Sequence, residues 1–157
     1  MRKDTVTYLF DANALIDAGE RFYPDDVFPC VWLKLNEELG IARAVTIAAV
    51  LRELRDIDPL PAWRDRIITI CTPHAYDETE VEVQTEYARL AREAVPGGAL
   101  PSGLSDVDLF VLAVGGLRAL PIVTRDREIR LSCDRGIVAT RAIDPLAFLR
   151  ERGWSFA

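Results

Sequence analysis

The sequence contains few of the residues on which several classes of site depend. It has 3 cysteines and 1 histidine in 157 residues, and Cys30, Cys71 and Cys133 lie far apart with no Cys-x-x-Cys pair. A disulfide framework, a zinc knuckle and a histidine-rich zinc site are therefore not indicated. A Ser/His/Asp triad would have to use His74, which lies in a loop-like segment. Scattered thiols are typical of the reducing cytoplasm, where we expect this protein.

Lysine and long apolar runs are also scarce. Lys3 and Lys34 are the only lysines among 19 basic residues, so arginine supplies nearly all of the positive charge. The longest apolar stretch, residues 109–116, is far shorter than the roughly 20 residues of a membrane span. The apolar run near the N-terminus is too short for a secretory signal. We therefore expect neither a membrane association nor a cleaved leader.

The charge balance bears on nucleic-acid binding. With 25 acidic residues the formal net charge is −6. A generally basic nucleic-acid-binding surface is therefore not indicated, because affinity for phosphate needs concentrated positive charge. A nuclease whose acidic site holds divalent cations remains compatible with this balance.

The chain has the length and composition of one soluble globular domain, which we assign to residues 1–157. Half of its residues are hydrophobic and 28% are charged. A segment rich in glycine and proline, residues 95–105, is expected to be a loop within this domain rather than a domain boundary.

Short strand patterns alternate with helical patterns along the chain. Runs of β-branched and aromatic residues predict strands at residues 5–10, 44–47, 121–124 and 137–140. Apolar residues at helical spacing, with caps where the sequence offers them, predict helices at residues 12–20, 28–39, 48–55, 78–94, 106–117 and 144–152. Residues 67–71 fit either a strand or the end of a helix. The alternation favours an α/β fold with a mostly parallel sheet covered on both faces.

Four acidic side chains fall where such a sheet gathers functional groups, beyond the carboxyl ends of its strands. Asp11 directly follows the first predicted strand, and Asp126 comes shortly after the third. Glu53 lies about two turns into the helix after the second strand, and Asp108 lies in the first turn of the helix that starts near Asp106. One edge of the sheet could therefore collect four carboxylates from four different elements.

Such a cluster favours binding of a hard metal ion. Carboxylates a few Å apart repel one another and raise one another's pKa unless a cation neutralises them. Mg²⁺ and Mn²⁺ prefer oxygen ligands and can promote hydrolysis of a phosphodiester. Structural interpretations also exist: Asp108 suits a helix N-terminus, Glu53 an exposed helix position and Asp126 a turn or cap. Asp11 has the fewest such structural interpretations, because a carboxylate directly after a buried strand has few structural roles.

The motifs around these acids resemble those of PIN domains. Residues 9–16 (LFDANALI) resemble the opening strand motif of that family, and residues 50–54 (VLREL) resemble its helix with a second acid. The segment from Asp108 to Asp126 resembles the third and fourth acid motifs. Residues 18–32 (AGERFYPDDVFPCVW) further resemble a bacterial PIN-like subgroup whose members are mostly uncharacterised.

The resemblance implies a three-layer α/β/α sandwich and a Mg²⁺- or Mn²⁺-dependent endoribonuclease that cleaves RNA. The catalytic and metal-binding residues would be Asp11, Glu53, Asp108 and Asp126. Asn13 and Thr124 would orient ligands or water. Many bacterial relatives are toxins of toxin–antitoxin pairs, often homodimers, silenced by an antitoxin that covers the acidic site. RNA would be held by arginines near the site, for which the candidates are Arg52, Arg55, Arg125 and Arg127.

Three points stay open at the level of sequence. Asp106 departs from the family pattern by adding an acid beside Asp108, although spacing favours Asp108 as the ligand. A phosphoryl-transfer protein of the receiver or haloacid-dehalogenase-like kind also places Asp after a strand, but it needs a downstream lysine, and none follows Lys34. The main alternative is a non-catalytic PIN-like protein-interaction domain. Its partner surface, unless these side chains belong to the core, would be Phe22, Tyr23, Phe28 and Trp32.

Overall fold

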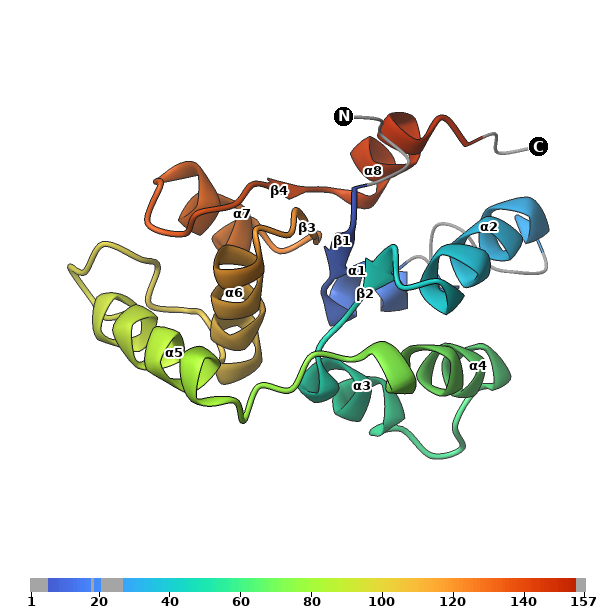
Figure 1. Ribbon diagram of the computed structural model, residues 1–157, viewed down its shortest axis with the longest axis horizontal. Helices are drawn as coiled ribbons and strands as arrows, with labels where there is room; N and C mark the ends of the chain where they lie inside the picture. Colours follow the sequence, from blue (N-terminus) through green and yellow to red (C-terminus); the bar gives the residue numbers. More distant parts are fainter. Residues whose placement is uncertain (1–5, 18, 21–26, 155–157) are drawn as a thin grey trace.

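Four strands alternate with helices in the computed structural model, which describes residues 6–17, 19–20 and 27–154 (Figure 1). The strands are β1 (Tyr8–Phe10), β2 (Ala44–Val45), β3 (Ile122–Val123) and β4 (Ala142–Ile143). The helices are α1 (Ala12–Asp17), α2 (Pro29–Gly40), α3 (Ala48–Arg55), α4 (Ala62–Cys71), the 3-10 turn η3 (Thr72–His74), α5 (Val81–Glu93), α6 (Asp106–Arg118), α7 (Arg127–Asp134) and α8 (Pro145–Arg152).

All four strands lie parallel in one sheet with the order β2-β1-β3-β4. β1 is an inner strand, and its three residues Tyr8, Leu9 and Phe10 are all buried. A strand covered on both faces needs such a continuous apolar run rather than an alternating one. The chain goes from β1 to β2 on one side and reaches β3 on the other. The crevice at the carboxyl ends of β1 and β3 is therefore the switch point at which sites in parallel sheets lie.

Helices cover both faces of this sheet (Figure 1). α5, α6 and α7 lie on one side, and α1 to α4 lie on the other. α6 approaches the sheet very closely: a Cβ atom on Gly115 would come within 2.8 Å of the side chain of Ile122 in β3. The predicted α/β fold with a parallel central sheet between helical layers is confirmed.

Both ends of α6 are sharply defined. At its start the Ser105 hydroxyl accepts a hydrogen bond from the Asp108 amide at 3.1 Å, and the Asp108 carboxylate accepts one from the Ser105 amide at 2.9 Å. This reciprocal capping box satisfies two helix-end amides. At its end Ala119 adopts the left-handed conformation with φ 54°. The chain therefore turns directly into β3, and the start of α6 lies at the carboxyl edge of the sheet.

The predicted strand at residues 137–140 is wrong. These residues are irregular, and the strand beside β3 is Ala142–Ile143 instead. Val138 is buried and packs at Gly116 of α6, where a Cβ atom would lie 3.1 Å from it. The apolar run at 137–140 therefore fills space beneath a helix and does not pair in the sheet.

The other predicted elements agree closely with the structure. The helix predicted at residues 48–55 has these same bounds in the structure. Residues 67–71, which fitted either a strand or a helix end, form the second half of α4. The Asp144 side chain caps α8 by accepting a hydrogen bond from the Ala147 amide, as predicted. α7 was not predicted. Trp32 is buried in the core. The predicted positions 5, 18, 22 and 23 lie outside the described residues.

No helix in the part of the chain that the structure describes is long and apolar enough to cross a membrane.

Candidate active site

Asp11 lies at the carboxyl end of β1 and is only 3% exposed. Its Oδ1 accepts a hydrogen bond from the Ala12 amide at 2.8 Å, and its Oδ2 accepts one from the Thr124 hydroxyl at 2.9 Å. Burial raises the pKa of Asp11 to about 7, reinforced by the charges of Asp108 and Asp126 and opposed by the two hydrogen bonds. This carboxylate is therefore held in a place that disfavours its charge.

Thr124, fully buried after β3, connects the loops that follow β1 and β3. Its hydroxyl oxygen accepts a hydrogen bond from the Asp126 amide at 3.0 Å. The hydroxyl donates toward two oxygens, Asp11 Oδ2 at 2.9 Å and Asn13 Oδ1 at 3.3 Å from its own oxygen. Asn13 Oδ1 also accepts a hydrogen bond from the Arg125 amide at 3.0 Å. Asn13 and Thr124 thus fix the two carboxylate-bearing loops relative to each other.

We expect Thr124→Val to raise the pKa of Asp11 above 7, because the hydroxyl donor that favours the ionised carboxylate is lost. The variant should also lose about 1–3 kcal/mol of unfolding free energy, because the Asp126 amide loses its acceptor. Carboxyl-carbon NMR titration and urea unfolding measure the two effects. Thr124→Ser keeps the hydroxyl and should leave the pKa of Asp11 in place. An unchanged pKa in Thr124→Val would exclude this donor role.

The two carboxylate oxygens of Asp126 have different surroundings in the structure. It is half-buried, and its Oδ1 caps α7 by accepting hydrogen bonds from the amides of Glu128 at 2.8 Å and Ile129 at 3.1 Å. The capping role considered for Asp126 is therefore present, and it fixes one carboxylate oxygen. The second oxygen forms no hydrogen bond with the residues that the structure describes. Asp126 can still offer that oxygen to a ligand.

Asp108 and Glu53 reach the same edge of the sheet from two helices. Burial raises the pKa of the half-buried Asp108, with a further rise from the charge of Asp126. Partial desolvation and the charge of Asp108 raise the pKa of Glu53, which is exposed on α3. These interactions connect all four predicted acids, since Asp11 is affected by Asp108 and Asp126 as well.

Asp106, two residues before Asp108, is engaged elsewhere. Its Oδ1 accepts a hydrogen bond from the Tyr87 hydroxyl at 2.6 Å. The Tyr87 ring stacks on Phe110 with the ring centroids 4.4 Å apart. Asp106 therefore joins α6 to α5, and the geometry associates Asp108 rather than Asp106 with the other three acids.

The donor set fits a hard cation by its chemistry. No three His, Cys, Asp or Glu side chains form a group that could hold a metal ion within residues 6–17, 19–20 and 27–154. All four predicted ligands nevertheless offer carboxylate oxygens, and a cation would reverse the pKa rise of Asp11, Glu53 and Asp108. Glu53 is exposed, so a change of its rotamer requires no repacking of the core, whereas a change of rotamer at Asp108 would release the hydrogen bond from the Ser105 amide.

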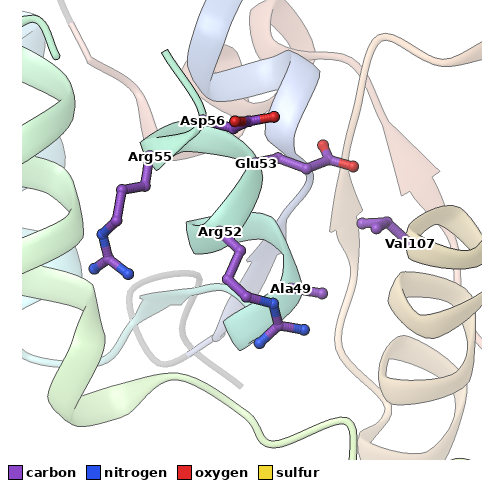
Figure 2. A pocket seen from close by; sticks show the side chains of 6 residues that line it. All are labelled: Ala49, Arg52, Glu53, Arg55, Asp56 and Val107. Atoms are coloured by element: carbon purple, nitrogen blue, oxygen red, sulfur yellow. The ribbon is translucent and has the colours of Figure 1, made fainter. Parts of the chain in front are cut away.

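A pocket of about 500 Å³ opens beside Glu53, between α3 and the first turn of α6 (Figure 2). It is lined by Ala49, Arg52, Glu53, Arg55, Asp56 and Val107. Of the arginines predicted to hold RNA, Arg52 and Arg55 are therefore at this pocket. Arg125 instead forms an ion pair with Asp17 at 3.1 Å, and Arg127 is exposed at the start of α7.

Solved structures share this fold. PAE2754 from Pyrobaculum aerophilum has a TM-score of 0.58 at 22% identity, with 95% of this chain and 98% of that chain covered. FitAcB from Neisseria gonorrhoeae has a TM-score of 0.58 at 17% identity, with 89% and 99% covered. FitAB bound to an IR36 DNA fragment has a TM-score of 0.58 at 16% identity, with 88% and 95% covered. Identities this low show the fold alone, and the predicted three-layer PIN-like sandwich is confirmed.

No curated protein sequence matches the chain significantly. The family model of a domain of unknown function, DUF4411, matches residues 8–156. This match spans nearly the whole chain and includes all four acids at the edge of the sheet. The chain therefore belongs to the DUF4411 family, built on a PIN-like α/β/α sandwich.

Proposed function

We propose that the protein is a Mg²⁺- or Mn²⁺-dependent endoribonuclease and the toxin of a toxin–antitoxin pair. The observation that carries this proposal is the position of Asp11. It is a nearly fully buried carboxylate at the switch point of the sheet, with the charges of Asp108 and Asp126 close enough to act on it. This arrangement weakens the fold when Asp11 is ionised, so it points to a functional role.

The chain's own side chains supply binding and orientation in this reaction. Asp11, Glu53, Asp108 and Asp126 would hold the cation through carboxylate oxygens. A bound divalent cation lowers the pKa of water and stabilises charge on the leaving oxygen of a phosphodiester. The Thr124 hydroxyl orients Asp11, and the amides of α7 orient Asp126. The ends of β1 and β3 thereby preorganise two of the four ligands before substrate arrives.

The assignment as a toxin, with an antitoxin partner and a homodimeric state, rests on the resemblance of the acid motifs to bacterial PIN domains. FitAB, which has a similar fold, was solved bound to a DNA fragment. This complex supports the proposal that a chain of this fold works together with nucleic acid. A non-catalytic interaction domain is the alternative that a cleavage assay tests directly.

The purified protein should cleave RNA when Mn²⁺ or Mg²⁺ is added, and EDTA should abolish the cleavage, because four carboxylates without a cation repel both one another and phosphate. Gel analysis of single-stranded and structured RNA measures the activity. Mn²⁺ should also raise the melting temperature of the same sample. A folded protein that cleaves no RNA and shows no shift with Mn²⁺ would contradict the proposal and favour the interaction domain.

A further inference from the structure

We infer that Arg64 is a positioning residue of the acidic site, because it holds the helix that carries Glu53 in place relative to the helix that follows Asp11. This inference rests on the proposed function, since it concerns how the cation ligands are arranged. Arg64 lies in the first turn of α4, and its side chain is only 7% exposed. Burial of a charged group is costly unless its hydrogen bonds are satisfied, so the partners of Arg64 show which parts of the fold it connects.

The Arg64 guanidinium joins three segments of the chain. Its Nε and Nη2 donate hydrogen bonds to Glu20 Oε1 at 3.2 Å and 2.6 Å, and its Nη1 donates one to the Leu54 carbonyl oxygen at 3.2 Å. The same side chain therefore connects α4 with the end of α3 and with the segment after α1. Arginine suits this role because its planar guanidinium points several donors in fixed directions at once.

Arg64 contacts the part of α3 that carries Glu53. This helix has only 8 residues, and both Glu53 and Leu54 lie in its last turn. The last carbonyl groups of a helix have no partner within the helix, and the Leu54 carbonyl finds its partner in Arg64. So short a helix depends on such contacts rather than on its own propensity. Without Arg64, the last turn of α3 would therefore fray and carry Glu53 with it.

The segment after α1 packs against the same turn of α4. Glu20 forms the ion pair with Arg64. Gly19 lies so close to Trp63 that a Cβ atom at this position would come within 2.8 Å of the indole ring. At its other end, α1 begins directly after Asp11, and its first amide donates a hydrogen bond to the Asp11 carboxylate. The contacts with α4 therefore fix the far end of the helix whose start holds Asp11.

A second ion pair of α3 leads elsewhere. Arg52 pairs with Glu78, which lies in the loop before α5, so this contact anchors α3 to that loop and not to α1. The Glu53 carboxylate points from α3 toward the start of α6, where the charge of Asp108 acts on it (Figure 2). The link through Arg64 therefore restricts how far Glu53 can move from the rest of the acidic site.

Mn²⁺ affinity tests this inference without RNA cleavage, with free Mn²⁺ measured by electron paramagnetic resonance. Arg64→Met keeps a long side chain and removes its donors. It should weaken Mn²⁺ binding about tenfold, the lower end of the loss that is usual when a group that orients a metal ligand is removed. In a Glu53→Gln background the same substitution should cause no further loss, because the ligand that Arg64 positions is already gone.

Arg152→Met is the matched control. Arg152 is also a buried arginine, with its side chain 5% exposed, and it pairs with Glu38. Its replacement removes a comparable ion pair between α8 and α2, two helices that carry none of the four acids, so the Mn²⁺ affinity should stay at the wild-type value. Equal losses in Arg64→Met and Arg152→Met would show a general effect of destabilisation and overturn the inference. An undiminished effect of Arg64→Met in the Glu53→Gln background would overturn it as well.

Amide hydrogen exchange of the metal-free protein separates this inference from the proposed function. Arg64→Met should speed exchange of the Asp56 and Ile57 amides, which donate to the last turn of α3, about tenfold, whereas Arg152→Met should not. If the wild-type protein binds no Mn²⁺ but Arg64→Met speeds this exchange, the nuclease proposal fails and the link through Arg64 stands. Unchanged exchange in Arg64→Met would overturn the inference, whatever the result with Mn²⁺.

Glu20→Gln tests whether the link runs through to α1. The substitution changes only the partner after α1 and keeps an oxygen that can accept from Arg64. Because a charge-assisted hydrogen bond is weakened, the exchange at the end of α3 should still become about threefold faster, and Mn²⁺ binding should weaken by a similar factor. If Arg64→Met does not fold, Glu20→Gln makes both comparisons in its place. No effect of Glu20→Gln on either quantity would overturn the inference.

Discussion

Replacing Asp11 with asparagine should lower the rate of Mn²⁺-dependent RNA cleavage by about a hundredfold or more. Asparagine has nearly the same size and keeps an oxygen that can accept the hydrogen bond from Ala12 or Thr124. It removes the negative charge at the position on which Asp108 and Asp126 act. Loss of one preorganised charged group in an active site typically costs a factor of about 10² to 10³ in rate. Initial rates at saturating Mn²⁺ measure the effect.

Asp106→Asn is the matched control for this substitution. Asp106 lies two residues from Asp108 but accepts its hydrogen bond from Tyr87, outside the group of four acids. Asparagine keeps that acceptor, so cleavage should stay near the wild-type rate. If Asp106→Asn loses activity and Asp108→Asn keeps it, the ligand on α6 is Asp106. A wild-type rate for folded Asp11→Asn would exclude Asp11 from the reaction.

The same substitution should stabilise the metal-free protein at neutral and alkaline pH. The pKa of Asp11 is about 7 in the folded protein, compared with its ordinary value of 3.8. The folded state therefore keeps a proton that the unfolded state has already lost. The contribution of Asp11 to stability is fully present below pH 3.8 and is lost as the pH rises to about 7. At about 1.36 kcal/mol per pKa unit, the loss amounts to about 4 kcal/mol.

The measurement is the difference in unfolding free energy between Asp11→Asn and the wild-type protein, obtained from urea unfolding across the pH range without metal. This difference should grow in favour of the variant by about 4 kcal/mol between about pH 4 and about pH 8. Mn²⁺ at about pH 8 should raise the melting temperature of the wild type much more than that of the variant. A difference that does not change with pH would show that Asp11 titrates normally.

Local sequence determines the inner part of the sheet but not its edge. Tyr8, Leu9 and Phe10 form a continuous apolar run followed at once by Asp11, and only a buried inner strand fits this pattern. Near the C-terminus two short apolar runs compete for one strand position. Residues 137–140 have the stronger strand composition, yet Ala142–Ile143 pairs with β3 because Val138 fills space against α6. Tertiary packing therefore decides which of the two segments pairs with β3, and the β-propensity of each segment alone does not reveal this.

The site was predictable to a similar degree. The sequence could place Asp11, Asp108 and Asp126 near one sheet edge, because each follows a strand or begins a helix there. Helical geometry also separates Asp106 from Asp108, since two residues turn by about 200° and face different neighbours. The pair of Arg52 and Glu78 had no signal in the sequence. Its members are 26 positions apart, in a helix and in a loop, and only the folded chain brings them together.

The position of α6 also restricts where residues can be inserted into the chain without moving the acidic side chains apart. It carries Asp108 at its start and returns through left-handed Ala119 directly to β3, whose end carries Thr124 and Asp126. A residue inserted within α6 would rotate Asp108 by about 100° relative to the sheet and separate it from the other acids. Insertions in residues 95–105 would leave that relation intact, because they precede the capping box at Ser105. Residues added before Ser105 therefore keep Asp108 in place relative to the other acids, whereas residues added within α6 do not.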